Sequence, residues 1–276
     1  MPPSEAGVEP VPGLTDTHAH LSYVAQRQGP AVMESIAKAY QASGASILDP
    51  GVEYDDFPAR KALLLHYPFV RLAAGIWPDT ASIQDRHHRA SALEEHVRDP
   101  ACIAVGECGL DYHWMNGSKE DQAELFRLQI ELALAYKKPL LVHSRNAHED
   151  TLAILGTVAS KIPVVIHCFG YDSAAALEYV RTGCFVSFAG NMSYSKSTAL
   201  REACSLVPDD RLLLETDAPY MNPEPRRGKE SSPLDIDRTY KTAAVSRNTS
   251  VDDLAGLVAT NAQAVFGPAW AVESAD

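Results

Sequence analysis

The sequence contains no apolar run long enough to cross a bilayer, which takes about 18 consecutive apolar residues. Its first residues, MPPSEAGVEPVPG, have neither the basic start nor the apolar core of a secretory signal peptide. We therefore expect neither a membrane protein nor a secreted one.

Cysteine is also scarce: the chain has five in 276 residues, and no two of them are spaced as C-x-x-C. An odd number without that spacing argues against a disulfide framework and against a zinc–cysteine site. This usage is typical of proteins from a reducing compartment, so we expect a cytoplasmic protein.

The chain has little positive charge. Its 24 basic residues stand against 36 acidic ones, which leaves a formal net charge of −12. This balance excludes broad electrostatic attraction to nucleic acid or to anionic membranes. A polyanionic substrate would have to be held by metal ions and by a local basic cluster.

The sequence lacks low-complexity segments, strong internal repeats and a G-x-G-x-x-G motif after its first apolar run. Instead, short apolar runs alternate with longer segments of helical periodicity. The eight apolar runs are GLTDTHAH, ASILDPG, VRLAAGI, CIAVGECG, PLLVHS, PVVIHC, CFVSFAG and RLLLETD. Helices are expected between and after them, over 30–43, 54–66, 84–98, 119–136, 147–156, 172–181 and 195–205, with two closing helices.

Eight strand–helix units predict an α/β protein, a (β/α)8 TIM-type barrel in a single domain. An open, doubly wound sheet is the alternative, but the glycine motif that marks many such sheets is missing. We expect the barrel to span residues 13–268. Residues 1–12 are expected to be a disordered lead-in, and residues 269–276 a C-terminal tail.

Most of the apolar runs carry, at or just after their end, a side chain that can bind a metal ion. These residues are His18, His20, Glu107, His143, His167 and Asp217. In a barrel the carboxyl ends of all strands meet at one mouth, so these side chains should converge. Each one alone is better explained as an ordinary half-buried or ion-paired group. Together they exceed the four ligands of a single zinc and suit two metal ions bridged by a carboxylate.

Several longer motifs surround these residues: DTHAHL, GECGLDYHW, KPLLVHSRNAHEDTLAIL, IHCFG, RLLLETDAPYMNP and a late RRGK. Their order and spacing resemble the TatD family of metal-dependent deoxyribonucleases. The resemblance covers nearly the whole chain. It implies a TIM-like barrel, a divalent-metal site and hydrolysis of DNA phosphodiesters, with 3′–5′ exonuclease action mainly on single strands.

The resemblance also implies roles for individual residues. It divides the ligands into His18, His20 and Asp217 for a first metal, His143 and His167 for a second, and Glu107 as the bridge. Glu107 and Asp217 are the expected catalytic residues, and Asp217 could also hold or accept the proton of the attacking water. Glu215 and Asp16 are expected to support the site from behind, Asp16 by orienting His18. The two ions could be Zn, Mn, Mg, Ni or Co, and imidazole ligands suit Mg least.

Four further residues are expected to contact the substrate at the barrel mouth: Trp77, His113, Arg145 and Arg227. Trp77 stands where the family commonly has a histidine, and its indole could stack on a base or simply pack. Arg145 could hold a phosphate with two N–H groups, or form a salt bridge at the start of the next helix. Arg227 belongs to the basic cluster at 226–229, which could contact phosphate or be a solvated loop. His113 either contacts the substrate or has only a structural role.

The expected function is therefore metal-dependent hydrolysis of phosphodiester bonds in DNA, preferably single-stranded, without a membrane or an obligate protein partner. One alternative is an amidohydrolase-type enzyme acting on a cyclic amide, a lactone or a phosphoester. Such enzymes often use a carboxylated lysine as the metal bridge, whereas here the bridge position is Glu107. Another alternative is a non-catalytic, metal-binding barrel.

Overall fold

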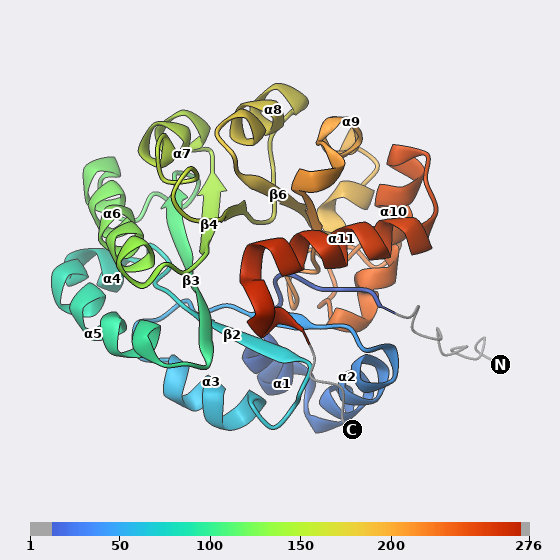
Figure 1. Ribbon diagram of the computed structural model, residues 1–276, viewed down its shortest axis with the longest axis horizontal. Coiled ribbons are helices and arrows are strands. Elements are labelled where there is room, and N and C mark those ends of the chain that lie inside the picture. The colour runs from blue at the N-terminus through green and yellow to red at the C-terminus, as the bar shows by residue number, and fades with distance from the viewer. Residues whose placement is uncertain (1–12, 272–276) are drawn as a thin grey trace.

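The computed structural model describes residues 13–271, and its strands form one parallel sheet in chain order. The strands are β1 (Ile47–Asp49), β2 (Val70–Ala74), β3 (Cys102–Asp111), β4 (Leu140–Arg145), β5 (Val164–Ile166), β6 (Phe185–Phe188) and β7 (Leu212–Leu214). Figure 1 shows them around a central axis, with helices in an outer ring. Strand–helix alternation with parallel neighbours is the arrangement of a TIM-type barrel, as the sequence predicts.

The helices that cover the sheet agree closely with the expected ranges. They are α1 (Leu21–Gln28), α2 (Pro30–Ser43), α3 (Phe57–Leu64), α4 (Thr80–Gln84), α5 (Arg86–Arg98), α6 (Lys119–Tyr136), α7 (His148–Leu155), α8 (Ser173–Arg181), α9 (Thr198–Leu206), α10 (Ile236–Arg247) and α11 (Val251–Phe266). Two predictions were inexact: α1 was not expected, and the range 84–98 begins inside the short helix α4. Short 3₁₀ turns complete the chain, at η1 (Gly190–Ser193), η2 (Asp209–Arg211), η3 (Pro233–Asp235) and η4 (Gly267–Trp270).

The extended segment 14–20 fills the eighth position of the barrel without forming a regular strand. It joins β1 on one side and the chain after β7 on the other, through the parallel bridges Asp16–Ile47 and Ala19–Ala218. The prediction of eight strands was therefore wrong at this one position. The reason is that β7 ends at Leu214 and Asp217 takes a left-handed backbone conformation (φ 55°). Segment 14–20 and the segment after β7 consequently run side by side only briefly.

Two glycines of β3, Gly106 and Gly109, allow its close approach to β4, and Gly109 is the tighter of the two. Gly109 has a φ of 140°, and a Cβ atom there would lie 2.0 Å from the carbonyl oxygen of His143. A side chain at this position would push the strands apart, so glycine allows the close approach. Because β3 carries Glu107 and β4 carries His143, this contact sets the spacing of two expected ligands.

The hydrophobic core runs through the strands and the inner faces of the helices and extends close to the end of the described chain. Trp270 is buried and stacks on Phe266 with the ring centroids 4.8 Å apart. The packed part therefore continues past the expected boundary at residue 268. The predicted lead-in, 1–12, lies outside the described residues, as do residues 272–276 of the predicted tail. None of the helices within 13–271 is both long and apolar enough to cross a membrane.

Candidate metal centre

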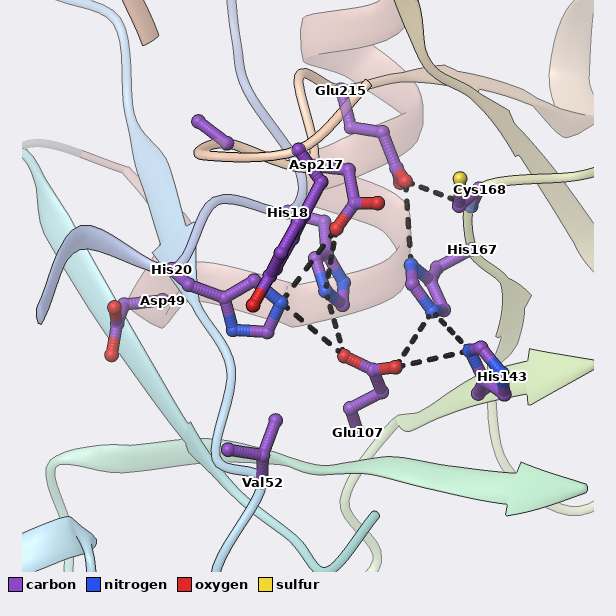
Figure 2. A network of polar contacts seen from close by, with 12 residues as sticks. His18, His20, Asp49, Val52, Glu107, His143, His167, Cys168, Glu215 and Asp217 are labelled. Carbon is purple, nitrogen blue, oxygen red and sulfur yellow. Dashed lines mark hydrogen bonds and ion pairs between the residues drawn. The ribbon is translucent and has the colours of Figure 1, made fainter. Parts of the chain in front are cut away.

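The six expected ligands come together at the carboxyl end of the barrel, as Figure 2 shows. His18 and His20 come from the closing segment, Glu107 from β3 and His143 from β4. His167 follows β5 directly, and Asp217 lies three residues after the end of β7. All are buried except His143, which is partly exposed. The convergence follows from the parallel sheet, because every strand ends at the same mouth.

Glu107 lies at the centre of this cluster, and its two carboxylate oxygens face different partners. Oε2 lies 3.2 Å from Nε2 of His18 and 3.4 Å from Nε2 of His20. Oε1 lies 3.1 Å from Nδ1 of His143 and 3.2 Å from Nε2 of His167. One carboxylate thus separates two pairs of imidazoles.

Asp217 completes the half of the cluster that contains the first two histidines. Its Oδ1 lies 3.9 Å from Nε2 of His18 and 3.6 Å from Nε2 of His20. Across the centre, the ring of His18 stacks on that of His167 with the centroids 3.9 Å apart. The stacking fixes the spacing between the two halves.

The arrangement fits divalent cations better than it fits a hydrogen-bond network. Three sets of ligand atoms each lie within 4.8 Å of one another: His18, His20 and Asp217; Glu107, His143 and His167; and His18, His167 and Glu215, which joins the two halves. Within the second set, Nδ1 of His143 lies 3.3 Å from Nε2 of His167. Among the described residues, the buried Nδ1 of His18 has no hydrogen-bond partner. Imidazole and carboxylate together are the usual ligands of transition-metal ions.

The electrostatics of the cluster keep its central carboxylate ionised. Burial by itself would raise the pKa of Glu107, but the charge of His167 and the hydrogen bonds from the surrounding imidazoles outweigh it. The pKa of Glu107 is consequently held well below its usual range. Burial likewise opposes the charged form of His20, yet the contacts with Asp217 and Glu107 raise its pKa to about 9. Without a metal, protonated imidazole supplies the positive charge that balances the carboxylates of the cluster. Metal binding must therefore displace protons.

The two acids expected behind the ligands behave differently. Glu215 lies 3.4 Å from Nδ1 of His167, and its carboxylate accepts hydrogen bonds from the N–H of Cys168 and the hydroxyl of Ser187. It therefore sits where it can orient the His167 ring. Asp16 does not reach the His18 ring. Its carboxylate accepts instead from the backbone N–H of His18, at 3.3 Å, and from Thr216.

Asp111 is the supporting residue that sequence reasoning missed. Its Oδ2 lies 2.8 Å from Nε2 of His143, while its Oδ1 accepts the backbone N–H groups of His113 and Trp114. The side chain is buried, and these bonds fix its carboxylate. A carboxylate on the far nitrogen of a metal-binding histidine sets the ring's orientation and tautomer. Its position in the sequence could have indicated this role, because Asp111 is an acidic residue at the end of an apolar run.

We expect Asp111→Asn to reduce activity by about 10- to 100-fold, because an amide cannot hold His143 as the carboxylate does. The loss should appear in kcat, together with weaker binding of one metal equivalent in a titration. Asp210→Asn, on the exposed 3₁₀ turn η2, is the matched control and should change neither quantity. Unchanged metal affinity in the Asp111 variant would show that the contact is only structural.

The expected substrate contacts lie around the mouth at different distances from the cluster. Trp77 borders it directly, with its ring centroid 5.8 Å from that of His143. Arg145 is exposed and lies 5.8 Å from the ring of Trp114, against which the ring of His113 also packs. Arg227 lies 4.4 Å from the ring of Tyr194. Only Trp77 of the four expected residues thus contacts a ligand side chain.

The sequence of this chain matches the model of TatD-related DNases over residues 15–267. It is 30% identical over 254 residues to an uncharacterized metal-dependent hydrolase, YabD, of Bacillus subtilis, covering 92% of this chain and 98% of that protein. It is also 30% identical over 240 residues to the 3′-5′ ssDNA/RNA exonuclease TatD of Citrobacter rodentium, with 85% and 91% covered.

Among solved structures, the TatD homologue YJJV of Escherichia coli K12 superposes with a TM-score of 0.80 at 25% identity. The superposition covers 92% of this chain and 97% of that one. The family match includes every strand that carries a ligand. The chain belongs to the TatD-related DNase family of metal-dependent hydrolases.

Proposed function

We propose that this protein hydrolyses phosphodiester bonds with two divalent metal ions, and that its substrate is single-stranded DNA cleaved from the 3′ end. One observation carries the proposal: each oxygen of Glu107 faces a separate set of ligand atoms. A carboxylate placed in this way would hold two ions, and paired ions are a recurrent device for in-line displacement at phosphorus.

The ions, when bound, supply Lewis-acid activation of water and neutralise the charge of the phosphoryl oxygens. The residues of the chain position and balance these charges. Glu107 keeps the two sets of ligands apart, and Asp111 and Glu215 orient His143 and His167. Asp217, with Oδ1 toward His18 and His20, is placed to accept the proton of the attacking water.

Groups around the mouth would hold the rest of the strand. The guanidinium groups of Arg145 and Arg227 are exposed and can each bind a non-bridging phosphate through two N–H groups. The indole of Trp77, beside His143, offers a face on which a base can stack. The substrate named for the Citrobacter rodentium relative, single-stranded DNA or RNA, supports this assignment.

An amidohydrolase-type activity on a cyclic amide or lactone is the second candidate, because it uses the same barrel. A small neutral substrate would have no use for the two exposed arginines at the mouth.

The free state of all five cysteines, four of them buried, supports our further proposal that the protein works in a reducing cytoplasm.

The test is cleavage of end-labelled single- and double-stranded DNA and RNA with Zn, Mn, Mg, Ni or Co added to metal-free protein. We expect a ladder that shortens from the 3′ end on single-stranded DNA. A dihydropyrimidine and a lactone serve as neutral substrates. Hydrolysis of these, with no cleavage of any nucleic acid, would contradict the proposal in favour of the second candidate.

We expect the double variant Arg145→Ala/Arg227→Ala to raise KM more than it lowers kcat, because phosphate contacts exist in both the ground and transition states. The log–log salt dependence of binding should also flatten, by about 0.7 for each lost contact. Arg127→Ala/Arg181→Ala, with two exposed arginines on α6 and α8, removes the same charge away from the mouth. Equal KM values and equal slopes in both double variants would show that Arg145 and Arg227 are solvated and do not contact phosphate.

A further inference from the structure

A cavity of about 260 Å³ opens beside His20, between α1 and the loop that follows β1. We call it the His20 cavity. The residues that line it beside His20 include Ser22, Tyr23, Gln26, Val52 and Glu53. In Figure 2, Val52 lies on the His20 side of the ligand cluster and away from His143. The cavity therefore adjoins one half of the metal centre.

One wall of the His20 cavity is an aromatic ring that is held in place. The ring of Tyr23 stacks on that of His20, with centroids 5.6 Å apart and planes 27° from parallel. The guanidinium of Arg27 lies 5.6 Å from the Tyr23 ring and 5.2 Å from the Tyr220 ring. An aromatic side chain fixed in this way loses little conformational entropy when a flat ligand packs against it.

The polar groups of the wall are available to a ligand. Among the described residues, the side chains of Ser22, Gln26 and Glu53 form no hydrogen bond or ion pair. The neighbouring carboxylate, Asp56, is occupied: it pairs with Arg60 at 2.8 Å and accepts the N–H of Val52 at 3.0 Å. Glu53 thus presents a carboxylate whose two oxygens remain free to accept hydrogen bonds.

This chemistry decides which part of a nucleotide can enter. Carboxylates in the wall repel phosphate, so the cavity does not suit the backbone. Its volume is below the roughly 300–1,000 Å³ of pockets for drug-sized ligands, which suits one base. A carboxylate accepts best from two adjacent N–H donors, and guanine carries such a pair on its Watson–Crick edge. Thymine presents one N–H between two carbonyl oxygens, which a carboxylate repels.

We propose that the His20 cavity is a nucleobase subsite that selects guanine over thymine at a nucleotide flanking the scissile phosphate. Tyr23 packs against the base and Glu53 accepts its N–H groups. The inference rests on the proposed nuclease function and adds to it a preference in sequence.

The test measures kcat/KM on short single-stranded DNAs that differ only in having dG or dT at either nucleotide flanking the cleaved bond. We expect the unmodified protein to favour dG by about tenfold at one of the two positions, the discrimination of one good bidentate contact. Glu53→Gln keeps the size of the side chain but removes the double acceptor, so the preference should disappear. Tyr23→Leu should lower kcat/KM on both substrates by about tenfold, mainly through KM.

Glu202→Gln, on the exposed face of α9, changes the net charge equally and should keep the preference. Thermal unfolding of each variant verifies the fold. Equal rates on dG and dT in the unmodified protein, or an unchanged preference in Glu53→Gln, would overturn the subsite. So would an equal gain on both substrates in Glu53→Gln, since Glu53 would then only repel the backbone. If no nucleic acid is cleaved with any metal, the proposed function fails, and the subsite fails with it.

Discussion

Replacement of Glu107 by glutamine is expected to abolish hydrolysis and to reduce metal binding in both halves of the centre. Glutamine keeps the shape of the side chain but removes the negative charge and turns one acceptor into a donor. Each carboxylate oxygen faces two imidazoles, so one substitution disturbs both sets of ligand atoms. We expect a loss in kcat on the order of 1000-fold, comparable to the removal of one strong transition-state contact.

The measurement combines single-turnover cleavage with the metal content of the protein after equilibrium dialysis. Glu131→Gln, on the exposed side of α6, removes the same charge and should retain both metals and full activity. Circular dichroism of the Glu107 variant separates a lost site from a lost fold. Two bound metals and normal turnover in Glu107→Gln would be incompatible with a bridging carboxylate.

Removal of the metal ions is expected to abolish activity reversibly and to lower the thermal stability of the barrel. A ligand that binds only the folded state stabilises it by about 2.7–4.1 kcal/mol at 100 to 1,000 times its Kd. For a domain of this size, that corresponds to a fall in Tm of about 5–10 °C on chelation. Addition of the metal should restore both the Tm and the activity.

This stabilisation should depend on pH in a defined direction. Metal binding requires neutral imidazoles, and in the metal-free cluster Asp217 and Glu107 raise the pKa of His20 to about 9. Protons compete with the metal for these nitrogens, and their concentration is higher at lower pH, so the gain in Tm at a fixed metal concentration should be smaller at pH 6 than at pH 8. Glu107→Gln serves as the control, because chelation should leave its Tm almost unchanged. A Tm of the unmodified protein that does not respond to chelation would show that the cluster holds no metal.

Much of the fold could be predicted because its determinants are local. The apolar spacing in 119–136 predicts α6 residue for residue, and the same holds for α2 over 30–43. The position of the ligands could also be predicted, although the residues are up to 199 positions apart in the sequence, because a parallel barrel brings every strand's carboxyl end to one mouth. The His18–His20 spacing is sufficient to place both rings on one side.

Other features depend on contacts between distant segments, and no local pattern encodes them. Whether segment 14–20 forms a strand depends on the backbone of Asp217, which lies next to it in the barrel but about 200 positions away in the sequence. The bond from Asp111 to His143 depends on the register of β3 against β4, and that register depends on the space left at Gly109.

The sequence by itself therefore determined the barrel, the chemistry of its ligands and their common location, because periodicity and strand ends are local properties. Only the tertiary structure decided which atom of each ligand faces which partner. It directed one oxygen of Glu107 to His18 and His20 and the other to the remaining imidazoles. It also turned Asp16 toward a backbone amide instead of a ring. The direction of a side chain is set by packing from several strands at once, and this information exists only after the chain has folded.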